Sequence, residues 1–155
     1  MSTATAIAIQ PGHVGLNVTD LERSVAFYTR VLDLQAVARN TDGERHYAFL
    51  ARDGQVLLTL WQQADGAFDG ARSGLHHLAL RVESVAEVQA LQERLAELGI
   101  ERRYGGIVLH AEGADSGGVY FSDPDGIRLE VFAPSGVAAT GAGPGSEHGP
   151  SCGHF

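Results

Sequence analysis

The chain has 155 residues, of which 44% are hydrophobic, and this size fits one compact domain or two small halves that share a core. Its net charge of −8 argues against a nucleic-acid partner, because phosphate binding needs a basic surface. No apolar run approaches the roughly 20 residues that span a bilayer, and the first residues lack a basic signal region. We therefore expect a cytoplasmic protein without membrane contact, and its single cysteine, Cys152, excludes an internal disulfide framework.

The first half of the chain predicts one strand, one helix and three further strands. Residues 11–18 alternate between apolar and polar side chains, as in a half-buried strand. Thr19 and Glu22 form a capping-box pattern that opens a helix with an apolar face through Leu32. Strands follow at 35–38, 46–50 and 55–61, with Asp53-Gly54 as a hairpin turn before the last of them.

The second half repeats this order after a glycine-rich linker at 64–74. The sequence His13-Val-Gly-Leu-Asn-Val recurs 64 residues later as His77-Leu-Ala-Leu-Arg-Val. Ser84 and Glu87 give a second capping box, Gly99 ends the second helix, and Asp123-Pro-Asp-Gly marks a turn. Further strands are predicted at 107–111, 118–122 and 127–132. The sequence thus predicts an α+β fold of two βαβββ modules, at 11–63 and 75–133, in a single domain over 1–133.

A tail rich in Gly, Ala, Pro and Ser follows at 134–155. Its composition is typical of a disordered segment. It contains three metal-capable side chains, His148, Cys152 and His154, but their spacing is not a zinc signature. We expect the tail to dock on a neighbouring subunit rather than to ligate a metal.

Strand parity places two histidines and one carboxylate on the concave faces of the predicted sheets. His13 and His77 alternate against the Val and Leu side chains that cover the helices, whereas His76 shares the core parity. Glu130 lies between Leu129 and Val131, where an unpaired buried carboxylate would be costly. Two interpretations stay open: a 2-His-1-carboxylate metal site, or an arginine-paired Glu130 beside two unrelated histidines.

Three further side chains are candidates for substrate binding. Asn17 and Arg81 have the concave parity, and Trp61 shares the parity of Leu57 and Thr59. Packing is the alternative role for Trp61, and an ion pair is the alternative for Arg81.

These residues resemble the vicinal oxygen chelate superfamily. The resemblance rests on the segment from His13 to Phe27-Tyr28, on His77-Leu-Ala-Leu, and on Tyr120-Phe-Ser-Asp-Pro-Asp-Gly leading to Glu130. The superfamily includes glyoxalase I, extradiol dioxygenases, fosfomycin-resistance thiol transferases and bleomycin-binding proteins. The resemblance implies paired βαβββ modules around a divalent metal, with His13, His77 and Glu130 as ligands and, in short chains, a homodimer.

Departures from the superfamily pattern narrow the expected reaction. Glyoxalase I has a fourth carboxylate ligand, and two alignments place Leu58 or Leu57 at that position here. The resemblance to extradiol enzymes gives Tyr120 a contact with substrate near the metal and places His110 behind the ligands. We therefore expect a metal-dependent, extradiol dioxygenase-like enzyme that acts on a small catechol or another vicinal-oxygen substrate. Fe(II) is the favoured ion, and Mn, Zn, Ni or Co are possible; the alternatives are a glyoxalase-like lyase or isomerase and a drug- or metabolite-binding protein.

Overall fold

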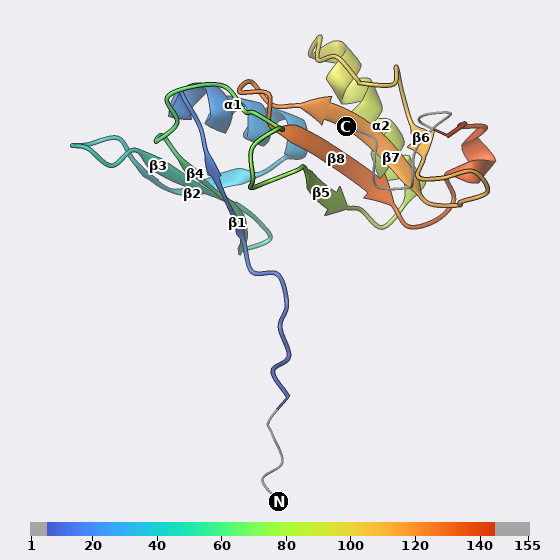
Figure 1. The fold of residues 1–155 in the computed structure, drawn as a ribbon, viewed down its shortest axis with the longest axis horizontal. Coiled ribbons are helices and arrows are strands. Elements are labelled where there is room, and N and C mark those ends of the chain that lie inside the picture. The colour runs from blue at the N-terminus through green and yellow to red at the C-terminus, as the bar shows by residue number, and fades with distance from the viewer. Residues whose placement is uncertain (1–5, 145–155) are drawn as a thin grey trace, which may run out of the picture.

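Two four-stranded sheets lie side by side in the computed structural model, which describes residues 6–144 (Figure 1). The first sheet has the order β1-β4-β3-β2 and contains β1 (Val14–Asn17), β2 (Gln35–Asn40), β3 (Tyr47–Arg52) and β4 (Gln55–Trp61). The second has the order β5-β8-β7-β6 and contains β5 (Leu78–Arg81), β6 (Val108–Leu109), β7 (Gly117–Ser122) and β8 (Arg128–Ala133). This arrangement confirms the predicted α+β fold of two βαβββ modules.

Each module carries one helix against one face of its sheet. Helix α1 (Leu21–Leu32) covers the first sheet, and α2 (Val85–Glu97) covers the second. Apolar strand residues such as Leu16, Leu58 and Leu129 are almost completely buried on the helix side. The alternate strand positions therefore form an open face on each sheet, as the predicted parity requires.

The two helices begin differently. Ser84 and Glu87 form the predicted capping box of α2, in which the Ser84 amide donates to Glu87 Oε2 at 2.9 Å. The capping box predicted for α1 is wrong, because Asp20 is its N-cap and accepts from the Arg23 amide at 3.0 Å. The Thr19 hydroxyl instead contacts Asp125 in the second module.

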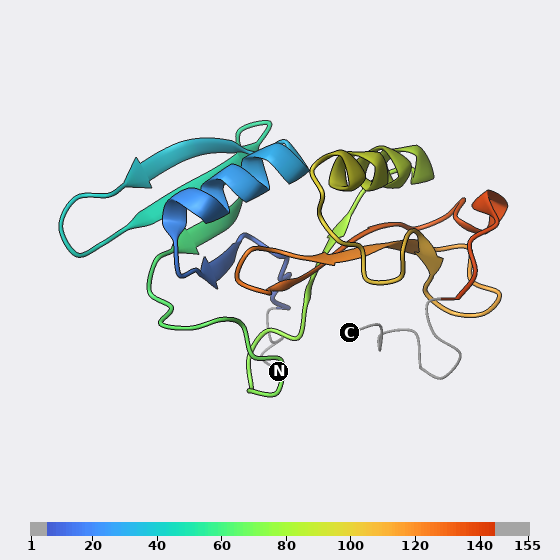
Figure 2. The same cartoon turned by 90° about the horizontal axis from the view of Figure 1, so that it is seen from above.

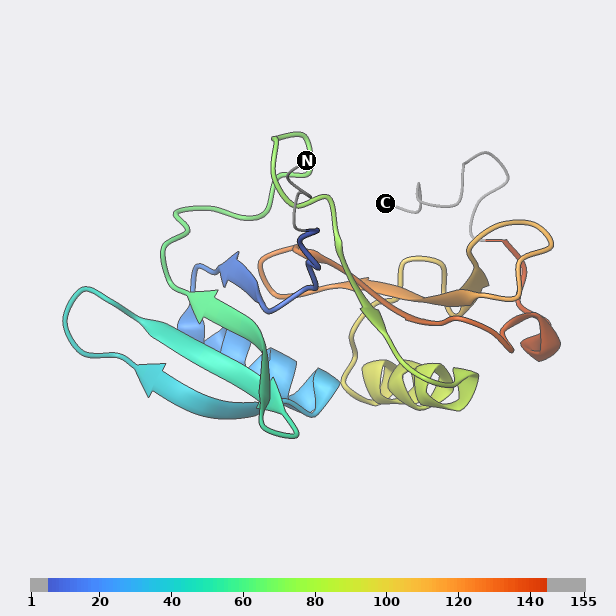
Figure 3. The same cartoon turned by 90° about the horizontal axis from the view of Figure 1, so that it is seen from below.

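The turn Asp123–Gly126 fastens the second module to the start of α1. The buried Tyr28 hydroxyl donates to Asp123 Oδ2 at 2.9 Å. Asp125 accepts from the Thr19 amide at 2.9 Å and from Arg23 at 2.6 Å. The two modules are therefore joined through buried polar contacts as well as through the packing of α1 near α2 (Figures 2 and 3).

The chain continues along the second module after β8. Val137 is fully buried, and the Leu109 amide donates to the Gly143 carbonyl at 2.9 Å. The tail side chains His148, Cys152 and His154 lie outside the described residues. Within 6–144, neither helix is long and apolar enough to cross a bilayer.

Candidate functional site

A single acidic side chain lies in the strands that the structure describes. It is Glu130 in the middle of β8, and its side chain is 8% exposed. Its direct neighbours in the sheet are Ala79 on β5 and Tyr120 on β7. Neighbours in register share a face, so Glu130 projects from the open face, away from α2.

The two oxygens of Glu130 have different surroundings. Oε1 is contacted by His110 Nε2 at 2.6 Å and accepts from the Tyr120 hydroxyl at 3.0 Å. Oε2 lies 3.3 Å from His77 Nε2. Two donors therefore fix one oxygen, and the other is directed at the predicted ligand His77.

These contacts keep Glu130 ionised. Burial by itself raises the pKa of this carboxyl, but the hydrogen bonds from His110 and Tyr120 and the nearby His77 outweigh burial, so the pKa is lowered overall. An ionised carboxylate only accepts hydrogen bonds, so His110 Nε2 must carry a proton. The other ring nitrogen, Nδ1, lies 2.9 Å from the Ser116 hydroxyl.

Ser116 was not among the residues predicted for the site. It precedes β7 directly, and its backbone carbonyl accepts from the His110 amide at 3.1 Å. One sequence signal could have identified Ser116. It is a polar residue at the end of the loop that begins at the candidate His110. The Tyr120 hydroxyl donates to the carboxylate itself, and its expected contact with substrate stays a prediction.

The remaining predicted ligand, His13, does not join this cluster. His13 is exposed and directly precedes β1, which belongs to the other sheet. Among residues 6–144, no three or more His, Cys, Asp or Glu side chains are placed to hold a metal ion. One chain, over the part described, therefore brings His77 and Glu130 together without His13.

Strand register identifies the counterpart of Glu130 in the first module as Thr59. Gly15 pairs with Thr59 on the parallel strands β1 and β4, just as its repeat partner Ala79 pairs with Glu130. The placement of Leu57 or Leu58 at this position was therefore wrong, although the position still lacks a carboxylate. Thr59 is 4% exposed, and its hydroxyl accepts from Trp61 Nε1 at 3.1 Å.

Trp61 belongs to an aromatic cluster on the open face of the first sheet. Its ring centroid lies 5.2 Å from that of Tyr47 and 6.1 Å from that of Phe49, and the last two are 5.2 Å apart. All three side chains are partly exposed. We call these three residues the aromatic wall.

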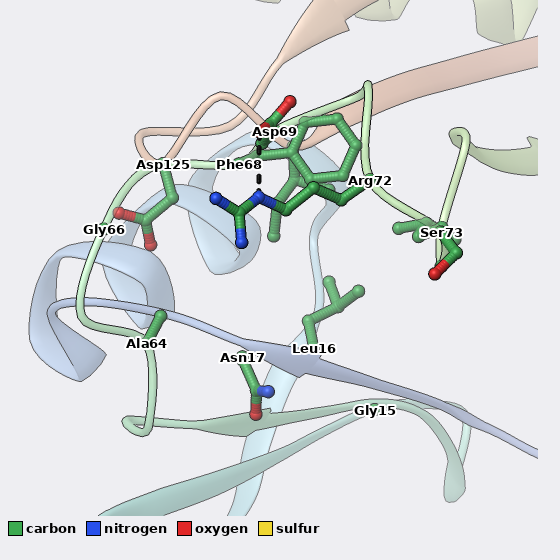
Figure 4. Close-up of a pocket in the computed structure, with 13 residues that line it drawn as sticks. Gly15, Leu16, Asn17, Ala64, Gly66, Phe68, Asp69, Arg72, Ser73 and Asp125 are labelled. Carbon is green, nitrogen blue, oxygen red and sulfur yellow. Dashed lines mark hydrogen bonds and ion pairs between the residues drawn. The ribbon is translucent and has the colours of Figure 1, made fainter.

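The other two candidate substrate residues occupy separate places. Arg81 is exposed on β5, in register with Phe132. Asn17 lines a cavity of about 300 Å³ between β1 and the linker, together with Arg72 and Ile127 (Figure 4). Asn17 is also the register neighbour of Trp61 on β4, so it shares the open face of the first sheet with the aromatic wall. Glu130 is not among the residues that line the cavity.

Residues 10–131 match the sequence profile of the Glyoxalase/Bleomycin resistance protein/Dioxygenase superfamily. Because this match covers most of the chain and the two-module fold agrees with it, the protein belongs to this superfamily. The vicinal oxygen chelate resemblance is thereby confirmed.

Relatives in the superfamily have different activities. The chain is 34% identical to a trivalent organoarsenical cleaving enzyme of Bacillus sp. (strain MD1) over 90% of this chain and 80% of that protein. It is 32% identical to the catechol-2,3-dioxygenase of Bacillus subtilis (strain 168) over 79% of this chain but only 40% of the dioxygenase. It is 31% identical to the lactoylglutathione lyase of Salmonella typhimurium, over 77% of this chain and 89% of the lyase.

Solved structures agree on the fold. A glyoxylase/bleomycin resistance protein/dioxygenase domain from Frankia sp. EAN1pec superposes with a TM-score of 0.70 at 28% identity, covering 82% of this chain and 98% of that domain. The fosfomycin resistance protein FosX of Listeria monocytogenes, crystallised with Mn(II) and a dihydroxypropylphosphonic acid, gives a TM-score of 0.64 at 20% identity, covering 83% of this chain and 95% of FosX. The second likeness concerns the fold alone.

Proposed function

We propose that the protein is a metal-dependent enzyme whose centre is formed by His13, His77 and Glu130. The observation that carries the proposal is the asymmetry of Glu130, whose Oε1 is held by two donors while Oε2 faces His77. Metal-binding carboxylates are commonly oriented by such partners. Two imidazoles and one carboxylate suit a divalent ion and leave coordination positions open.

The centre is completed by a second copy of the chain. His13 and Glu130 lie on different sheets, and the described part of one chain gathers no metal-binding group. The free edge strands β1 and β5 could approach one another across a two-fold axis, as an isologous dimer requires. His13 of one copy would then meet His77 and Glu130 of the other.

A mixing experiment tests this arrangement. His13→Ala and Glu130→Ala should each abolish metal retention when purified alone. After the two variants are mixed and exchanged, each mixed dimer has one intact site and one doubly broken site. Random exchange should therefore restore metal to roughly a quarter of the wild-type sites. A centre within one chain gives no recovery, and unchanged metal content in both single variants refutes the ligand assignment.

The proposed reaction is extradiol dioxygenase-like cleavage of a small catechol. The aromatic wall supplies a surface against which a flat ring can pack. A bound divalent metal would acidify a substrate hydroxyl and offer an open position for oxygen. His110 and Tyr120 hold Glu130 in its ionised form, while the wall orients the ring and excludes water. The 32% identity to a catechol-2,3-dioxygenase, of which the chain covers 40%, supports this reaction.

Oxygen uptake with catechols tests the reaction. Protein purified without oxygen should retain iron and should consume oxygen when a catechol is added, with a ring-opened product. Turnover of a hemithioacetal with nickel or cobalt would instead indicate a lyase. Tight binding of a catechol without turnover would indicate a binding protein.

Cleavage of organoarsenicals is the second candidate, since it is the activity of the 34% identical relative. Trivalent arsenic is a soft centre that prefers thiolates, and this chain has a single cysteine, Cys152. Arsenite release from a trivalent aryl arsenical, compared between wild type and Cys152→Ser, tests this candidate.

A further inference from the structure

We infer that the substrate carries an acidic group and that Arg81 binds it. This inference rests on the proposed function, because it places the acidic group beside the same Glu130 centre. It commits to an anionic aromatic diol as the substrate class.

The charge of the strands differs from the charge of the whole chain. The chain has a net charge of −8, yet Glu130 is the single acid in the described strands. Those strands carry four arginines: Arg39, Arg52, Arg81 and Arg128. A bound divalent cation would add positive charge to the open face of the second sheet. Glu130 is the single acidic residue in the described strands that could offset this charge.

Three of the four strand arginines have a clear structural partner. Arg39 pairs with Glu22 on α1, and Arg52 donates to the carbonyl of Leu32 at the end of the same helix. Arg128 lies over the ring of Phe68, with its guanidinium carbon 5.8 Å from the ring centroid. Each of these three arginines therefore has a partner within the fold.

Arg81 differs from the others. It is exposed, and no ion pair or hydrogen bond joins its side chain to any of residues 6–144. Its register neighbour is Phe132, and the register neighbour of Ala79, two positions back on β5, is Glu130. Two positions along a strand correspond to about 7 Å, so Arg81 reaches a group attached to a substrate that is held at Glu130.

The surroundings of Arg81 suit a planar, anionic ligand. Phe132 packs near His110, with ring centroids 5.3 Å apart, and gives this end of the open face an apolar floor. A guanidinium binds a carboxylate through two parallel hydrogen bonds, and partial desolvation strengthens that pair. In an acidic protein, a cation of this kind also attracts a ligand that the rest of the surface repels.

Binding of two matched catechols tests the inference. 4-Methylcatechol and 3,4-dihydroxyphenylacetate share a ring and differ in the carboxylate. Trp61 is the only tryptophan of the chain and belongs to the aromatic wall, so its fluorescence reports binding. Titrations without oxygen, with and without added Fe(II), should show the acid binding about tenfold more tightly than the methyl compound, with the difference shrinking in high salt.

Three variants complete the test. Arg81→Gln should abolish the preference for the acid without weakening 4-methylcatechol binding, and Arg81→Lys should keep most of it. Arg39→Gln removes the same charge from the helix side of the first sheet and should leave the preference intact. Equal wild-type affinities, an equal loss for both ligands in Arg81→Gln, or the same loss in Arg39→Gln would overturn the inference. If the preference holds but oxygen uptake or metal retention fails, the proposed reaction falls and the recognition of the anion stands.

Discussion

At the scale of single residues, we expect the donors that hold Glu130 to determine how strongly the proposed centre binds metal. His110→Ala removes the donor at 2.6 Å from Oε1, and Tyr120→Phe removes the donor at 3.0 Å. Loss of such a partner commonly lowers metal affinity by about 10- to 100-fold. We expect the larger loss in His110→Ala, because its contact is shorter and its ring also lowers the pKa of Glu130 by charge. Calorimetric titration with Mn(II) or Zn(II) measures both, and equal affinity in wild type and His110→Ala would contradict this role.

Tyr28 makes the stability of the protein sensitive to alkaline pH. Burial and the neighbouring Asp123 raise the pKa of the Tyr28 hydroxyl well above its ordinary value of 10.0. Above about pH 10, the unfolded chain therefore loses this proton while the folded chain keeps it, so the free energy of unfolding falls as the pH rises.

Tyr28→Phe should remove that contribution. At neutral pH the variant should be less stable by about 1–2 kcal/mol, because Asp123 loses one donor but keeps the amides of Asp125 and Ile127. Between about pH 9 and pH 11, the difference between wild type and variant should narrow. Urea denaturation across this range measures it, and a constant difference would show that Tyr28 does not retain its proton.

Local sequence patterns predicted some of these residue contacts and missed others for physical reasons. Alternation along β5 selected His77 over His76, since the side-chain period of a strand is fixed by its backbone. The partner of Thr19 is Asp125, 106 residues away, so no local pattern could displace the capping-box prediction. The match of Thr59 to Glu130 depended on strand pairing, which the repeat alone does not give.

At the scale of secondary-structure elements, two glycines allow β7 to pass between its neighbours. A Cβ on Gly118 would lie 2.3 Å from the Val131 carbonyl oxygen and 2.8 Å from Phe132. One on Gly117 would lie 2.3 Å from the Val108 carbonyl oxygen. Since these obstacles are largely backbone, they cannot move aside as a flexible side chain would.

Gly118→Ala should therefore distort the pairing of β7 with β8. We expect a loss of about 1–3 kcal/mol or more in the free energy of unfolding, as for other overpacked sites. The distortion lies two residues from Tyr120, so metal affinity should fall as well. Gly12→Ala is the matched control, because nothing lies within 4 Å of its added Cβ. Equal melting temperatures for the two variants would mean that the sheet adapts without cost.

At the scale of the whole molecule, the elements of each module follow from its sequence, whereas the relation between the modules does not. The alternation that selected His13 involves only His13 and the residues of β1 that follow it. Whether His13 meets Glu130 in the same chain depends on how the modules are joined. That arrangement is set by contacts between distant residues such as Tyr28 and Asp123, whose hydroxyl and Oδ2 are 2.9 Å apart. The sequence accordingly predicted the ligand set but left open which chain supplies each ligand.

Asp125 is the residue on which the joining of the modules most depends. Its side chain is 5% exposed and accepts from the Thr19 amide, the Thr19 hydroxyl and Arg23. Asp125→Ala leaves the Thr19 amide without this acceptor and should cost about 2–3 kcal/mol, because unpaired buried donors are expensive.

Asp33→Ala provides the comparison. It also breaks a link between the modules, but the Asp33 side chain is 62% exposed, so its loss should cost less than about 1 kcal/mol. If Asp125 holds the modules together, Asp125→Ala should broaden or split the calorimetric unfolding transition, and Asp33→Ala should keep it single. Metal retention should fall in Asp125→Ala even at temperatures where each module stays folded, because the proposed dimeric centre requires a fixed arrangement of the module with His13 and the module with Glu130. A single, unshifted transition with full metal content would show that the modules keep their arrangement without Asp125.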